Sequence, residues 1–108
     1  MDAWQLSEID GARMAENRLY MEFLRVPDLS AGLYVLEAGA TDPQSPHTED
    51  ELYYVVHGRG SITVGDETRE VTTGSLVFVS ATVPHHFHDV MERLEILVAF
   101  GPPEDARG

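Results

Sequence analysis

A chain of 108 residues, 43% of them hydrophobic, is long enough for one globular domain with a core of its own. Its net charge of −12 argues against binding to nucleic acid or to anionic membranes, because such binding needs clustered basic side chains and this chain has scattered arginines and no lysine. The lack of cysteine excludes disulfides and thiolate metal ligands, so any metal must bind to histidine, carboxylate, amide or water.

Residues 1–29 form an N-terminal segment before the main β pattern. Leu6–Asn17 has the composition of one or two helical turns, with Ser7 as a candidate cap, although Gly11 weakens a helix there. Leu19–Val26 is predicted to form an early strand. The first residues lack the basic start and the long apolar run of a signal peptide, and no stretch has the length of a membrane span. We therefore expect a cytoplasmic protein.

The chain from about residue 30 to residue 101 has the pattern of an antiparallel β protein. Gly65, in a four-residue turn, predicts a tight hairpin because glycine accepts the positive φ that such turns require. Many short strands without intervening helices are typical of a sandwich or a barrel. The expected strands are rich in β-branched, aromatic or alternating apolar residues: Leu33–Glu37, Glu51–Val56, Ser61–Val64, Thr68–Val71, Leu76–Val79 and Leu94–Phe100.

A first polar cluster precedes the second of these runs. Ser45, His47, Glu49 and Glu51 are spaced two apart, so they share one face if the segment is extended. A histidine and two carboxylates on one face repel and desolvate one another unless a cation neutralises them. The cluster therefore favours a metal site, and taken alone it is equally compatible with a polar strand end that faces water.

A second cluster holds three of the five histidines of the chain. In an extended strand His85, Phe87 and Asp89 face one side, and His86 and His88 face the other. Phe87 prefers burial, so the pattern predicts that His85 faces the interior with it. The alternative is an inward metal-binding pair made by His86 and His88.

The first cluster resembles the first motif of the cupins, a family of small double-sheet β-barrels. That motif reads Gly, five residues, His-x-His, three or four residues, Glu, six residues, Gly. Here Gly39 is followed by five residues, Ser45 and His47 flank one residue, three residues lead to Glu51, and six more lead to Gly58. Every spacing is kept, and only the first histidine is replaced, by Ser45.

The second cluster resembles the second cupin motif, which reads Gly, five residues, Pro-x-Gly, two residues, His, three residues, Asn. Here Gly74 is followed by five residues, Ser80 and Thr82 stand in the places of Pro and Gly, His85 is kept, and Asp89 replaces Asn. Two motifs in register are a far more specific signal than one short pattern.

The resemblance covers about Gly39 to Phe100 and implies an all-β fold: an antiparallel double-stranded β-helix, or jelly-roll barrel. We expect a single domain over residues 1–108 with its barrel core at about residues 30–101. The resemblance also implies a homodimer.

The resemblance implies a divalent metal, with Fe, Mn, Ni and Zn as the candidates. The implied ligands are His47, Glu51 and His85. Because the hydroxyl of Ser45 is a poor ligand, Glu49 or Gln44 is a candidate fourth donor. Tyr53, on the same face as Glu51, is a candidate cavity residue.

Two functions fit these features. The first is a metal-dependent enzyme that acts on a small organic molecule by oxygenase, isomerase or lyase chemistry. The second is a non-catalytic small-molecule-binding or regulatory protein with a structural or vestigial metal site.

Overall fold

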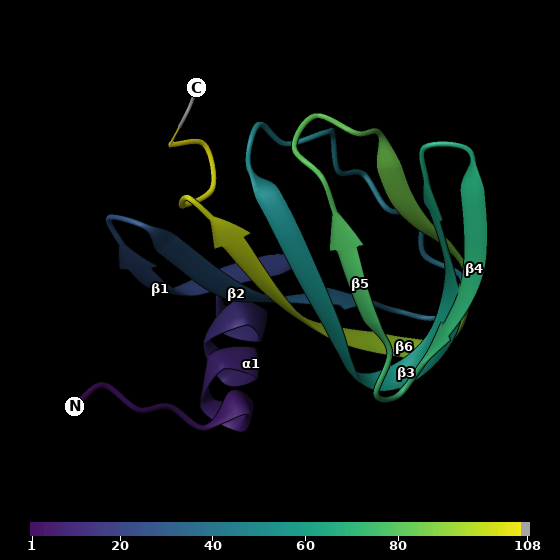
Figure 1. The fold of residues 1–108 in the computed structure, drawn as a ribbon. Helices are drawn as coiled ribbons and strands as arrows, with labels where there is room; N and C mark the ends of the chain where they lie inside the picture. Colours follow the sequence, from purple (N-terminus) through teal and green to yellow (C-terminus); the bar gives the residue numbers. More distant parts are fainter. Residues whose placement is uncertain (107–108) are drawn as a thin grey trace.

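The computed structural model describes residues 1–106, which form one helix and six strands (Figure 1). Every strand pair is antiparallel, the strand order is β1-β2-β6-β3-β4, and β5 pairs with β3. The predicted all-β class and its barrel are therefore confirmed. Within the described residues, no helix has the length and apolar character needed to cross a membrane. The elements are α1 (Leu6–Ala15), β1 (Tyr20–Val26), β2 (Leu29–Leu36), β3 (Asp50–Val64), β4 (Glu67–Thr72), β5 (Leu76–Val79) and β6 (His85–Gly101).

The two long strands β3 and β6 form the spine of the barrel. They pair along most of their length, from Asp50 opposite Gly101 to Val64 opposite His85. The first part of β3 also pairs with β5, and its second part pairs with β4. Figure 1 shows these strands bending around a common interior. As a result, the start of β3 and both ends of β6 lie on the walls of one barrel.

Glycine allows the bend in β3. We expected two separate strands on either side of Gly58, but β3 continues through it with register shifts on both sides. Gly58 has a φ of +109°, and a Cβ there would lie 2.1 Å from the carbonyl oxygen of Arg93. Only glycine fits this close approach of two backbones. The hairpin prediction is confirmed: Gly65, with a φ of +60°, connects β3 to β4.

Strand β2 separates two cores. Tyr34 and Leu36 face the barrel interior, whereas Leu33 and Val35 face Ile9 of helix α1 on the outside. Burial on both faces explains why β2 reads as an almost continuous apolar run.

The N-terminal segment contains the predicted helix and the predicted early strand. The helix cap differs from the prediction. Gln5 is at the N-cap without a side-chain hydrogen bond, and Ser7 lies inside the first turn of α1. The packing of Ile9 on β2, rather than a capping side chain, therefore holds this helix in place.

Candidate metal centre

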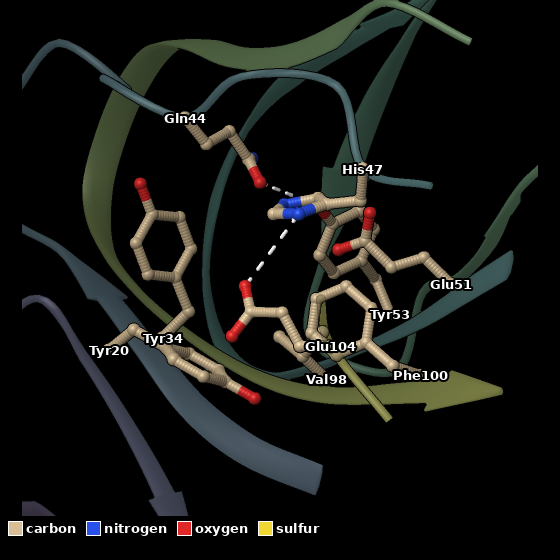
Figure 2. Close-up of a pocket in the computed structure, with 9 residues that line it drawn as sticks. All are labelled: Tyr20, Tyr34, Gln44, His47, Glu51, Tyr53, Val98, Phe100 and Glu104. Atoms are coloured by element: carbon tan, nitrogen blue, oxygen red, sulfur yellow. Dashed lines mark hydrogen bonds and ion pairs between the residues drawn. The ribbon is translucent and has the colours of Figure 1, made fainter. Parts of the chain in front are cut away.

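His47, Glu51 and His85 come together at the barrel interior, although the second and the third lie 34 positions apart in the sequence. His47 lies on the segment before β3, Glu51 near the start of β3, and His85 at the start of β6. Each offers one ligand atom, and the three atoms lie within 4.8 Å of one another. Figure 2 shows the His47 ring and the Glu51 carboxylate at the same cavity. The three residues implied by the motif resemblance thus form one cluster.

Two ligand atoms of this cluster are buried without a hydrogen bond. Nε2 of His85 lies 3.1 Å from Oε1 of Glu51, and the two residues are 5% and 2% exposed. The two atoms form an ion pair only when His85 is protonated; with a neutral ring they are two acceptors facing each other, and neither has another hydrogen-bond partner within the described chain. Burial of such atoms without a partner destabilises a fold. Together with the His47 ring, they make a donor set that fits a divalent cation.

The hydrogen bond of Nδ1 determines the tautomer of His85. Nδ1 lies 2.9 Å from the carbonyl oxygen of Val83, which only accepts hydrogen bonds. In the neutral ring the proton therefore sits on Nδ1, and Nε2 is free to act as a ligand. Burial lowers the pKa of His85, but the Glu51 carboxylate and the Val83 carbonyl outweigh burial and raise it above its ordinary value.

A small cavity lies beside the cluster. Its volume is about 80 Å³, and its lining residues include three tyrosines, Gln44, Glu51 and Glu104, although apolar atoms make up nearly all of its accessible wall. Tyr53 and Gln44 are both on its wall, where the Tyr53 hydroxyl donates to Oε1 of Gln44 at 3.0 Å. The Gln44 amide nitrogen donates to Asp42 at 2.6 Å. Gln44 is therefore a cavity residue whose oxygen and nitrogen both have partners in the protein.

Ser45 and Glu49 lie elsewhere. The alternation argument does not hold for Ser45, which is exposed and outside the cavity lining, because the chain is not yet in a strand before Asp50. Glu49 is only 1% exposed, but its carboxylate is directed to the C-terminal turn, where it accepts from the backbone N–H of Asp105 at 2.8 Å. It also accepts from the Thr48 hydroxyl. Glu49 thus contributes to holding this turn.

The second histidine cluster divides between the two faces of β6. The prediction for the inner face is confirmed: His85 and Phe87 are buried. His86 is exposed, and His88 lies on the outside, where Nε2 is 2.8 Å from the Thr63 hydroxyl. An inward pair of His86 and His88 is therefore wrong. Asp89 is exposed rather than inward because its φ of +48° breaks the alternation.

Five residues at the cavity were missed by the sequence analysis: the apolar Val98 and Phe100 and the polar Tyr20, Tyr34 and Glu104. The Glu104 carboxylate lies 3.6 Å from Nδ1 of His47. Burial raises the pKa of Glu104, and the charge of His47 partly offsets this. The three polar residues carry no motif, and only the three-dimensional pairing of β1 with β2 and the path of the C-terminal turn bring them to the site.

The cupin domain family model matches residues 32–100, which is more than half of the chain. The chain is a cupin. It is 51% identical over 104 residues to "Uncharacterized protein SCO3923" of Streptomyces coelicolor, a match that covers 96% of this chain and 99% of that protein.

Solved structures share the fold at lower identity. TT1209 from Thermus thermophilus superposes with a TM-score of 0.75 and 21% identity, over 95% of this cupin and 99% of that chain. The DMSP lyase DddQ from Ruegeria pomeroyi superposes with a TM-score of 0.69 and 23% identity, over 77% of this cupin and 42% of that chain. At such identities the likeness establishes the barrel fold and leaves the chemistry open.

Proposed function

We propose that this cupin binds one divalent metal ion through His47, Glu51 and His85 and acts with it on a small organic molecule. The observation that carries the proposal is the pair of buried ligand atoms on Glu51 and His85, which face only each other and lie within 4.8 Å of a ligand atom of His47. Two imidazoles and one carboxylate suit Fe, Mn, Ni or Zn and leave open positions for a substrate.

The residues around the ion have separate roles in this proposal. Glu51 supplies the negative charge, and the Val83 carbonyl holds the His85 ring with Nε2 toward the site. Tyr53 and Gln44 close one wall of the cavity and limit the entry of water. The bound ion supplies Lewis acidity or redox chemistry with dioxygen, which fits isomerase, lyase or oxygenase reactions. A lyase is among the proteins that share this fold.

A non-catalytic binding function is the second candidate. Ser45 stands where the first cupin motif has a histidine, and it is exposed in the structure. A site with three protein ligands binds metal more weakly than one with four, and the small cavity of about 80 Å³ favours a compact ligand. In this alternative the same residues bind a ligand without transforming it.

We also propose a homodimer through the outer face of β3 and β5. Four large apolar side chains there are between 40% and 65% exposed and form neighbouring cross-strand pairs: Leu52 with Phe78 and Tyr54 with Leu76. A two-fold related copy would cover this apolar set with an identical one. Light scattering should give a dimer for the wild type and a monomer for Phe78→Glu. The predicted cytoplasmic location stays a prediction.

Calorimetric titration with Fe(II), Mn(II), Ni(II) and Zn(II) tests the metal site. The expected result is one ion per chain for the wild type and no binding after His47→Ala, Glu51→Ala or His85→Ala. His86→Ala and His88→Ala are the matched controls, because these histidines lie on the outside of the same strand. Stoichiometric binding by His85→Ala, together with loss in the two control variants, would overturn the assignment.

A further inference from the structure

The Tyr20 hydroxyl is buried beside the cavity without a hydrogen-bond partner in the described chain. Tyr20 begins β1 and lines the cavity, and its hydroxyl oxygen is buried with no hydrogen bond within the described chain. Its ring is held in place by edge-on contacts with Tyr34 and Phe100, each with ring centres 6.4 Å apart. The ring is therefore held in place, and its hydroxyl is left without a hydrogen bond from the described protein.

Packing accounts for the Tyr20 ring but not for its hydroxyl. The ring lies over Gly32 of β2, where a Cβ would come within 2.3 Å of the Tyr20 hydroxyl oxygen. An aromatic ring over a cross-strand glycine stabilises a sheet, and phenylalanine serves this purpose equally well. A buried hydroxyl without a partner is unfavourable. The hydroxyl at this position thus points to a hydrogen bond with a ligand in the cavity.

Glu104 reaches the same cavity from the C-terminal turn, which is anchored by its backbone. The N–H of Glu104 donates to the Ser30 hydroxyl at 2.9 Å, and its carbonyl accepts from Arg25 at 2.9 Å. The next residue, Asp105, donates to buried Glu49 at 2.8 Å. These backbone bonds place the Glu104 side chain at the cavity, near Tyr20 and with its carboxylate 3.6 Å from Nδ1 of His47 (Figure 2).

The charge of the cavity restricts what it accepts. Within the part of the chain that the structure describes, Glu51 and Glu104 line the cavity and neither arginine nor lysine does. A ligand with an uncompensated negative charge is therefore disfavoured, whereas an ammonium or a hydroxyl donor is favoured next to Glu104. Both Tyr20 and Glu104 lie outside residues 32–100, the part that matches the family model.

We propose that Tyr20 and Glu104 form a recognition pair for a compact, uncharged or cationic ligand. Tyr20 donates a hydrogen bond to an oxygen of the ligand, and Glu104 accepts one from its amine or hydroxyl group. The proposal deepens the proposed function, on which it rests for the use of this cavity, because it names the class of substrate. The recognition itself needs no metal.

Three probes of equal size separate these interactions: ethanolamine, propylamine and acetate. Ethanolamine has both the ammonium group and the oxygen, propylamine lacks the oxygen, and acetate has the opposite charge. Amide chemical shifts in NMR spectra report their binding to ¹⁵N-labelled protein, with chelator and with Zn(II). In chelator, ethanolamine should bind more tightly than propylamine, and acetate should not bind.

The variants assign the contacts. Glu104→Gln should weaken the binding of ethanolamine and of propylamine by about tenfold, because a hydrogen bond to a charged group is lost. Tyr20→Phe should weaken the binding of ethanolamine by about fivefold and leave the binding of propylamine unchanged. Glu92→Gln, at an exposed position, is the matched control for the change of charge. Its spectrum and those of the test variants also report whether each protein is folded.

The outcomes distinguish the two proposals. Ethanolamine binding in chelator by a protein that takes up no metal would contradict the metal function and support the recognition pair. Metal uptake without any ethanolamine binding, or equal binding of ethanolamine by wild type, Tyr20→Phe and Glu104→Gln, would overturn the recognition pair.

Discussion

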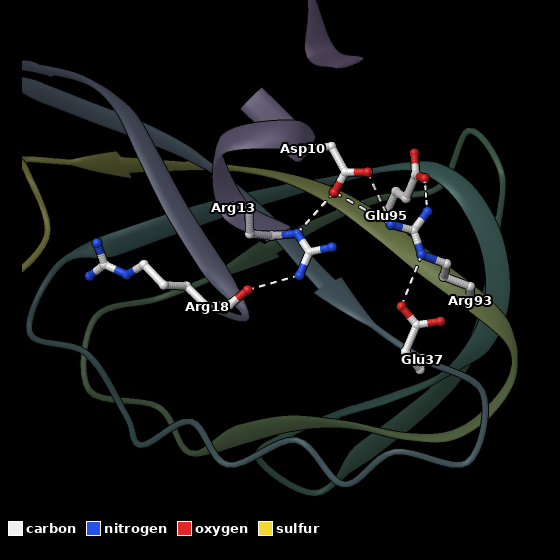
Figure 3. A network of polar contacts seen from close by, with 6 residues as sticks. All are labelled: Asp10, Arg13, Arg18, Glu37, Arg93 and Glu95. Carbon is white, nitrogen blue, oxygen red and sulfur yellow. Dashed lines mark hydrogen bonds and ion pairs between the residues drawn. The ribbon is translucent and has the colours of Figure 1, made fainter. Parts of the chain in front are cut away.

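The polar cluster that attaches helix α1 to β6 differs from the polar cluster inside the barrel (Figure 3). Outside, Arg93 donates to Asp10 at 3.2 Å and to Glu37 at 3.0 Å, and it also contacts Glu95. Arg13 donates to the same Asp10 at 2.9 Å and to a backbone carbonyl at 2.8 Å. Charges of both signs alternate, and each guanidinium has acceptors in the protein.

Inside the barrel, the protein does not supply a complementary donor or acceptor for every buried polar atom. Glu51 and His85 are more deeply buried than Asp10 or Arg93, and yet one ligand atom of each faces only the other, with no further hydrogen-bond partner in the described chain. A cluster that the protein satisfies by itself stabilises the fold, whereas a buried cluster that it does not satisfy is suited to bind something else. By this criterion the outer cluster has a structural role, and the inner cluster is the candidate for a functional one.

The largest expected effect is the loss of metal-dependent stability. A metal at a hundredfold excess over its dissociation constant should raise the free energy of unfolding of the wild type by about 2.7 kcal/mol. His85→Ala should lose this entire gain, and Glu37→Gln, in the outer cluster, should keep it. Urea unfolding with metal and with chelator measures both. Identical wild-type curves in the two conditions would show that the inner cluster binds no metal.

The next effect concerns the outer cluster. Arg13 is buried, so Arg13→Met leaves Asp10 and the Arg18 carbonyl without this donor and should cost about 1–3 kcal/mol. The cost should be the same with metal and with chelator. Arg18→Met is the matched control: its exposed pair with Glu16 should contribute less than about 1 kcal/mol. A metal-dependent cost for Arg13→Met would mean that the two clusters are coupled.

A smaller effect is expected when the inner carboxylate is neutralised in chelator. Glu51→Gln removes a buried charge that the metal-free protein satisfies only in part. Its free energy of unfolding at pH 8 should stay within about 1 kcal/mol of the wild type. Chemical denaturation in chelator gives the value. A loss as large as that of Arg13→Met would assign Glu51 a structural role and weaken the contrast between the clusters.

The smallest effects are opposite responses to pH. Burial raises the pKa of Asp10, but its bonds with Arg13 and Arg93 outweigh burial and hold the pKa below the ordinary value of 3.8. Ionised Asp10 therefore stabilises the folded state above that value, and this stabilisation is lost as pH falls through the folded-state pKa of Asp10. The pKa of His85 is raised above 6.5, so in chelator its stabilisation is present below 6.5 and is lost as pH rises through the folded-state pKa.

Unfolding at several pH values in chelator measures these responses. Asp10→Asn should reduce the pH dependence of the free energy of unfolding at acid pH only. His85→Gln should reduce this dependence above pH 6.5 only. With metal present, the dependence on the upper side should reverse, because protons compete with the metal for the histidines as pH falls. A profile that His85→Gln leaves unchanged would contradict the coupling of His85 with Glu51.

Local pattern predicted the parts of the site that lie within strands. Alternation in β6 predicted which histidine faces inward, because Phe87 determines the buried side. Alternation failed for Ser45, which lies before β3 begins. The fold class followed from turn residues and strand composition, but the continuity of β3 through Gly58 did not, because it depends on the backbone of β6.

The remaining parts of the site depend on contacts between distant segments. Glu104 reaches His47 through a turn that Ser30, Arg25 and Glu49 hold. Tyr20 reaches the cavity because Gly32 on another strand leaves room for its ring. No spacing within the sequence encodes either contact.

A crystal structure of the zinc-loaded protein, with an anomalous difference map, tests the central claim most directly. We predict one strong peak inside the barrel, bonded to Nε2 of His85, a carboxylate oxygen of Glu51 and a ring nitrogen of His47, with Zn–N distances of about 2.0–2.1 Å. A fully occupied peak between His86 and His88 with none at the inner cluster, or no peak in the barrel under saturating zinc, would contradict the account.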